Sequence, residues 1–98
     1  SSPDVPITTN FMGFFKPLNY WAWAAELDVI SDDCYPDPDD PDSPYLAAMT
    51  RDLMRSLADG KPWLLMEQSV GAVNWRPSNA AKPEGMMRAW SYQALARG

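Results

Sequence analysis

The chain has 98 residues, a net charge of −5 and 46% apolar residues, and five of its residues are tryptophan. It is too apolar for a disordered segment and long enough for one small folded domain. Its acidic charge argues against a nucleic acid or an anionic membrane as partner, because both favour a face rich in Lys and Arg.

The cysteine and histidine content restricts the chemistry of any site. Cys34 is the single cysteine, and histidine is absent. A lone cysteine forms no internal disulfide, which favours a reducing compartment, and we expect a cytoplasmic location. The same scarcity of ligands argues against zinc or haem, so no metal or other cofactor is predicted. The apolar runs are too short to span a bilayer.

Apolar and β-branched runs predict three strands, and amphipathic stretches predict three helices. In chain order we expect a strand at 5–11, a helix at 17–26, a strand at 27–31, a helix at 43–59, a strand at 63–66 and a helix at 83–97. The continuous hydrophobicity of the strands is typical of strands covered on both faces. The alternation of strand and helix predicts an α/β fold with a parallel sheet and right-handed crossovers.

Each predicted helix has an apolar stripe that is expected to face the sheet. The stripes are Leu18, Trp21 and Ala25 in the first helix, Leu46, Met49, Leu53 and Leu57 in the second, and Met87, Trp90 and Ala94 in the third. Ser43 is the expected N-cap of the second helix, with Pro44 at its first helical position.

Polar residues follow the second and third predicted strands, where α/β proteins place ligands. Glu67 closes an apolar strand. A buried carboxylate at such a position must be paired or must face a cleft. The residues alone favour equally an ion pair with Arg76 or Arg88 and a functional role for Glu67.

Further candidates each have a structural alternative. Trp75 offers a flat apolar face to a sugar ring, although core packing is the more common role of a tryptophan. Tyr35 follows a strand end, where its hydroxyl can orient a carboxylate or its ring can pack in the loop. Asp33 lies on the same rim, and neighbouring Asp32 is expected to be solvated. The acidic run 37–42 is interpreted as a solvated loop, since its prolines do not fit an EF-hand.

Four stretches in this order and spacing resemble the β-galactosidases of glycoside hydrolase family 42. They are ITTNFMGFFKPLNYW (7–21), SDDCYPDP (31–38), KPWLLMEQSVGAVNWRPSN (61–79) and GMMRAWSYQALARG (85–98). The resemblance covers nearly the whole chain. It implies a (β/α)8 TIM barrel that hydrolyses terminal β-D-galactosides with retention of configuration.

The resemblance also implies roles for individual residues. Glu67 matches the catalytic nucleophile, in the motif MEQ at the end of the seventh strand. Trp75 matches a residue of the galactose pocket, and Tyr35 a tyrosine that contacts the nucleophile and the substrate region. Asp33 matches the aspartate of the same D-x-Y-P motif. The acid/base glutamate of the family lies outside the chain.

Residues 1–98 would then form a single incomplete domain, from about strand five to helix seven of the barrel. Such a segment has open strand edges, so we expect the isolated chain to self-associate. The full-length protein that contains it, called the parent below, is expected to be a homo-oligomer that binds a β-galactoside. The alternative function is a non-catalytic carbohydrate-binding module or a structural scaffold.

Overall fold

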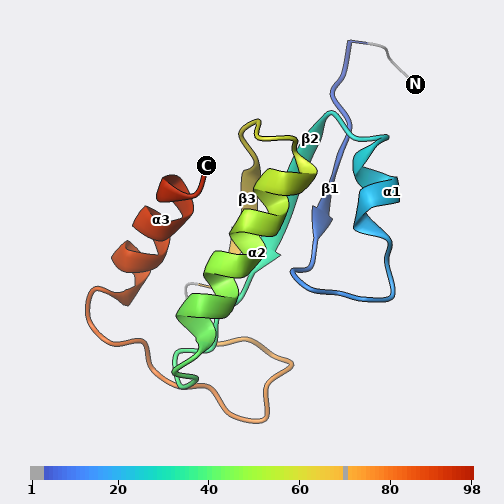
Figure 1. Cartoon of the computed structure of the whole chain (residues 1–98). Coiled ribbons are helices and arrows are strands. Elements are labelled where there is room, and N and C mark those ends of the chain that lie inside the picture. The colour runs from blue at the N-terminus through green and yellow to red at the C-terminus, as the bar shows by residue number, and fades with distance from the viewer. Residues whose placement is uncertain (1–3, 70) are drawn as a thin grey trace.

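The structure is a computed structural model that describes residues 4–69 and 71–98 (Figure 1). Its elements are β1 (Thr8–Phe11), α1 (Tyr20–Ala24), β2 (Val29–Cys34), α2 (Ser43–Leu57), β3 (Leu64–Gln68) and α3 (Met86–Ala96). The strands pair in the order β1-β2-β3, and both pairings are parallel. The predicted alternation of three parallel strands and three helices is therefore confirmed.

Two strands extend further toward their carboxyl ends than the sequence predicts. β2 continues to Cys34 instead of ending at Ser31, and β3 continues to Gln68 instead of Met66. The sequence predicts a loop at the polar residues Asp32, Asp33, Glu67 and Gln68. In the structure these residues continue the pairing of β2 with β3. As a result, Glu67 lies inside β3 rather than after it.

The helix starts also differ from the prediction. Asn19 caps α1, because its side-chain oxygen accepts a hydrogen bond from a backbone N–H of the first turn at 3.3 Å. The helix buries Tyr20 and leaves Trp21, which was expected to face the sheet, 61% exposed. In α2 the N-cap is Asp42, and Ser43 is the first helical residue.

The buried face of α2 matches the predicted stripe in part, because Leu57 is buried and Leu53 packs against the core. Its buried residues are Ser43, Ala47, Thr50, Arg51, Met54 and Leu57. Leu46 and Met49 are instead 49% and 57% exposed. Two polar residues on this face have hydrogen-bond partners: the Thr50 hydroxyl donates to the Leu46 carbonyl at 2.9 Å, and one guanidinium nitrogen of Arg51 donates to Gln93.

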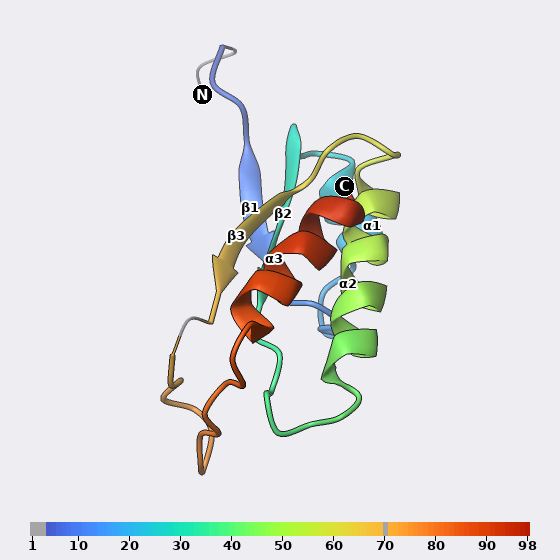
Figure 2. The ribbon, with the colours of Figure 1, turned by 90° about the vertical axis from the view of Figure 1, so that its left-hand side faces the viewer.

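One face of the sheet carries the core. The buried cluster consists of Phe11, Tyr20, Ile30, Met54, Leu57 and Trp63. Figure 2 shows α1 and α2 on one side of the sheet, and α3 contacts α2. Trp90 of α3 is buried, as predicted, with Met87 and Ala94 half-buried beside it.

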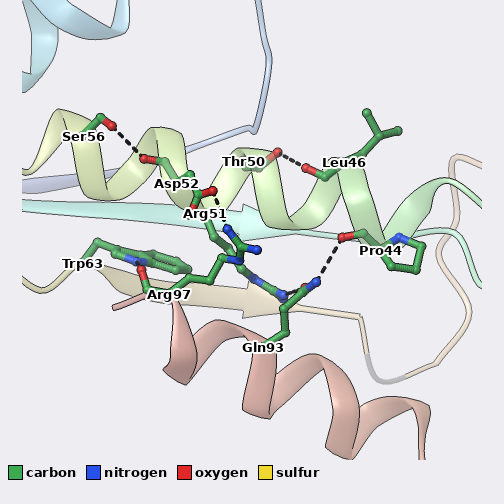
Figure 3. Close-up of polar contacts among 9 residues, drawn as sticks. All are labelled: Pro44, Leu46, Thr50, Arg51, Asp52, Ser56, Trp63, Gln93 and Arg97. Atoms are coloured by element: carbon green, nitrogen blue, oxygen red, sulfur yellow. Dashed lines mark hydrogen bonds and ion pairs between the residues drawn. The ribbon is translucent and has the colours of Figure 1, made fainter.

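Polar contacts fasten α3 to its neighbours (Figure 3). Arg97 pairs with Asp52 of α2 at 2.5 Å, and its carbonyl accepts from the Trp63 indole N–H at 3.2 Å. Gln93 accepts from Arg51 and donates to the Pro44 carbonyl at 3.0 Å. The end of α3 is thereby tied to α2 and to the start of β3.

The strands are not covered on both faces in the described residues, which corrects the prediction from their hydrophobicity. Ile7, Leu64 and Met66 are 51%, 47% and 43% exposed. An uncovered sheet with free edges fits the expected self-association, which stays a prediction. Among the described residues, none of the helices is long and apolar enough to cross a membrane.

Candidate active site

A β-bulge in β3 determines where Glu67 points. The pairing of β2 with β3 shifts between Asp32 and Asp33, so that Asp33 pairs with Glu67 and Met66 is the extra residue. In a regular ladder Glu67 would pair with Cys34, whose side chain is buried. Because one inserted residue reverses the face of everything after it, the bulge brings Glu67 to the face of Asp33.

Tyr35 is the direct partner of Glu67. Its phenol donates a hydrogen bond to the Glu67 carboxylate from the residue that follows β2. This hydrogen bond, together with some burial, raises the pKa of Tyr35 to about 12. The phenol therefore stays protonated, and able to donate, throughout the neutral range.

Among the described residues, Glu67 forms an ion pair with neither Arg76 nor Arg88, so the ion-pair interpretation is wrong. The Arg76 guanidinium donates to the Tyr35 carbonyl at 2.6 Å rather than pairing with Glu67. Glu67 is exposed at the carboxyl end of the sheet. Glu67, Tyr35 and Asn10 lie at the same end of the sheet, because β1 and β3 both pair in parallel with β2, which Tyr35 follows.

Asn10 contributes a contact that sequence reasoning missed. Its amide nitrogen donates to Asp33 Oδ2 at 2.5 Å, across the β1–β2 pairing. The other oxygen, Asp33 Oδ1, is buried and has no hydrogen-bond partner among the described residues. The parallel register, with Asn10 opposite Ser31, is the signal that could have revealed the contact. Asn10 thus fixes the more accessible oxygen, Oδ2, which keeps a second lone pair for a further hydrogen bond.

Trp75 lies at the surface rather than in the core. Its indole meets the Tyr35 ring edge-on, with ring centroids 4.8 Å apart and planes at 87°. The side chain is 60% exposed, so it is not part of the core that the described residues form. An indole held by one edge-on contact keeps a large apolar surface free for a ligand.

A pocket of about 560 Å³ opens beside these residues. It is lined by Met12, Gly13, Asp33, Cys34, Tyr35, Pro36, Ser43, Leu46, Ala47, Thr50 and Trp75. Glu67 is not among the lining residues. Tyr35 connects the two regions, because its ring lines the pocket and its hydroxyl contacts Glu67.

Asp32 lies behind the site and is buried, so the expectation that it is solvated is wrong. Its Oδ1 accepts from the Gly13 backbone N–H at 2.9 Å. Burial raises the pKa of Asp32 to about 7, with the Asp33 charge adding to it and the Gly13 hydrogen bond and Arg51 opposing it. The carboxyl group therefore keeps its proton at a pH where an exposed aspartate has lost it.

We expect the raised pKa of Asp32 to make the folded protein less stable as pH rises. Between the ordinary aspartate pKa of 3.8 and the folded-state pKa of about 7, the folded state holds a proton that the unfolded state has released. Stability must then fall across this interval and level off above it. Asp32→Asn should flatten this decrease, measured as the thermal midpoint of the parent at pH 5 and pH 8. Asp39→Asn, at an exposed position, is the control, and an equal pH slope in both variants would refute the assignment.

Residues 1–98 match the family model for glycoside hydrolase family 42, described as β-galactosidase. The chain is 55% identical over 97 residues to β-galactosidase BgaB of Geobacillus sp. (strain Y412MC61), covering 99% of the chain and 14% of that protein. It is 45% identical to β-galactosidase LacA of Lactobacillus acidophilus, covering 98% of the chain and 14% of that protein.

Solved structures of β-galactosidases also match the fold. The enzyme from Bacillus circulans sp. alkalophilus matches with a TM-score of 0.88 and 52% identity, over 99% of the chain and 14% of the other chain. The enzyme from the haloarchaeon Halorubrum lacusprofundi matches with a TM-score of 0.87 and 37% identity, over 98% and 16%. The chain spans about 14% of the length of the curated relatives it matches. It belongs to glycoside hydrolase family 42, the β-galactosidase family.

Proposed function

We propose that this chain is part of the catalytic domain of a retaining β-galactosidase, and that Glu67 is its nucleophile. The observation that carries the proposal is the hydrogen bond from Tyr35 to an exposed Glu67 at the carboxyl end of a parallel sheet. Barrel enzymes build their active sites at this end. Membership of the β-galactosidase family supplies the substrate class, terminal β-D-galactosides.

The proposed chemistry has two steps. A Glu67 oxygen attacks the anomeric carbon while the bond to the leaving oxygen breaks and an acid protonates that oxygen. In the second step, the residue that acted as the acid now acts as a base and deprotonates a water molecule. This water hydrolyses the galactosyl ester and releases Glu67. In retaining enzymes the two carboxyl groups are about 5–5.5 Å apart. We assign the acid/base role to a residue of the parent outside this chain.

The other site residues bind and orient in this proposal. Tyr35 holds the Glu67 carboxylate in position for attack and stays protonated while doing so. Trp75 provides an apolar surface for the C–H face of the galactose ring. Asp33 lines the pocket, and its Oδ2, held by Asn10, accepts a sugar hydroxyl with its second lone pair.

We further propose that residues 1–98 form one incomplete domain, corresponding to the barrel from about strand five to helix seven. The helices on one face of the sheet and the uncovered apolar residues on β3 support this placement, since barrel strands face helices outside and packed side chains inside. A barrel of this class typically has about 250 residues.

The proposal can be tested by trapping the galactosyl ester in the parent. A 2-deoxy-2-fluorogalactoside with an activated leaving group reacts with the nucleophile and leaves an ester that hydrolyses slowly. Mass spectrometry of the digested protein should find the label on the peptide that contains Glu67. A label on another peptide would disprove the role of Glu67. Binding of galactose with neither label nor turnover would favour the non-catalytic module.

A further inference from the structure

Trp75 lies on a long connection that has few apolar contacts. Residues 71–85 lead from β3 to α3 without helix or strand, and Trp75 is 60% exposed. The edge-on contact with Tyr35 alone does not hold an indole in one orientation against the conformational entropy of such a loop. The position of Trp75 must therefore depend on polar contacts of the loop.

Asn79 closes the part of the loop that contains Trp75. Its Oδ1 accepts from the Val73 N–H at 3.0 Å, and its Nδ2 donates to the Val73 carbonyl at 3.0 Å. One side-chain amide thus satisfies both backbone polar groups of a residue on the other side of Trp75. This two-point contact fixes distance and orientation together, as a pair of strands would.

Arg76 attaches the closed loop to the sheet. Its guanidinium donates to the Tyr35 carbonyl at 2.6 Å, and its side chain is half-buried. Tyr35 is also the residue whose ring meets Trp75 and whose hydroxyl contacts Glu67. Lys82 binds the loop at its other side, donating to the Gly71 carbonyl at 3.4 Å and lying 5.5 Å from the Trp90 ring centroid.

We propose that Asn79 and Arg76 are positioning residues that hold Trp75 against Tyr35, beside Glu67, before substrate arrives. Neither side chain touches the sugar in this arrangement. Both act through Trp75, Asn79 by closing the loop and Arg76 by anchoring it. The inference rests on the proposed function, because it takes the free surface of Trp75 as the sugar platform.

Asn79→Ala removes both contacts with Val73, and Asn79→Asp keeps only the acceptor. In the parent, Asn79→Ala should lower kcat/KM for an aryl β-galactoside by roughly 10- to 100-fold, because small misplacements of binding groups have effects of that size. The loss should come mainly from a higher KM, with Asn79→Asp intermediate. Asn74→Ala, at an exposed position of the same loop, is the matched control and should change kcat/KM less than about 2-fold.

Arg76 offers a test by conservative replacement. Arg76→Ala removes the anchor, whereas Arg76→Lys keeps a donor that can reach the Tyr35 carbonyl. Lysine should therefore restore most of the kcat/KM that alanine loses. An Arg76→Lys enzyme as impaired as Arg76→Ala, or an Asn79→Ala enzyme as active as Asn74→Ala, would overturn the proposal.

A double-mutant cycle shows whether the effect passes through Trp75. If the two residues only position Trp75, Asn79→Ala should have no further effect in a Trp75→Ala background. If the losses of kcat/KM caused by Asn79→Ala and by Trp75→Ala were fully additive, the proposal would be overturned. A general folding defect in Asn79→Ala would give this additive result.

A measurement without substrate separates this inference from the proposed function. Hydrogen exchange at the Val73 N–H should be slow in the parent and fast in Asn79→Ala. Fast exchange in the parent would overturn the loop closure even if the galactosyl ester forms on Glu67. Slow exchange with the trapping label on another peptide would leave the closure intact and remove the role of Glu67.

Discussion

Glu67→Gln in the parent is expected to lower kcat by about 10⁴- to 10⁶-fold, the range seen when a nucleophile is removed from an enzyme. An amide matches the shape of the carboxylate and can accept from Tyr35, but it does not attack an anomeric carbon. KM should change little, since the sugar contacts assigned to Trp75 and Asp33 remain. Initial rates with an aryl β-galactoside provide the measurement.

Two comparisons make the Glu67 result specific. Glu84→Gln replaces an exposed carboxylate in the loop between β3 and α3 and should keep kcat within about 2-fold. In Glu67→Ala, added azide fits the space of the missing carboxylate and should attack the anomeric carbon, giving an α-galactosyl azide. A Glu67→Gln enzyme with more than about a tenth of the parental kcat, or a β-configured azide product, would exclude Glu67 as the nucleophile.

The position of the site followed from topology that can be read in the sequence. Alternation of apolar runs with helical stripes predicts parallel strands, and parallel strands end at the same edge of a sheet. Glu67 and Tyr35, more than thirty positions apart, could therefore be placed together before any contact was known. The roles of these residues came from the resemblance of whole motifs, because spacing alone left Glu67 equally open to an ion pair.

The bulge at Met66 could not be read from the sequence. LLMEQ has no glycine or other residue that marks an irregular strand, and the extra residue appears only in the pairing with β2. It nevertheless decides whether Glu67 faces Asp33 or the buried side of the sheet. A local feature of this kind depends on tertiary pairing, which local propensity does not contain.

The buried polar residues were missed for a related reason. Apolarity placed Leu46 and Met49 inside, whereas the fold buries Arg51 and Asp32. These groups can be buried because distant partners satisfy part of their hydrogen bonding, Gln93 for Arg51 and the Gly13 backbone for Asp32. Partners more than fifteen positions away do not show in a helical or strand pattern.

A polypeptide limited to these 98 residues is expected to be inactive on lactose. Because we assign the acid/base residue to another part of the parent, the leaving oxygen would depart as an alkoxide, and general acid catalysis contributes about 10²- to 10⁴-fold. The missing part of the pocket removes substrate positioning as well, a further large loss. Aryl galactosides with good leaving groups depend less on protonation of the leaving oxygen, so they provide the most sensitive assay. Circular dichroism checks that the isolated chain is folded.

Asp33 is the carboxylate that could make this expectation fail, because it lies opposite Glu67 in the backbone pairing of β2 with β3. Its Oδ2 accepts a hydrogen bond from Asn10, so the group is held as an acceptor rather than as an acid facing the leaving oxygen. If the isolated chain did hydrolyse lactose, Asp33→Asn would identify the acid. Loss of that activity in Asp33→Asn would place the acid/base residue within this chain and refute its assignment to the rest of the parent.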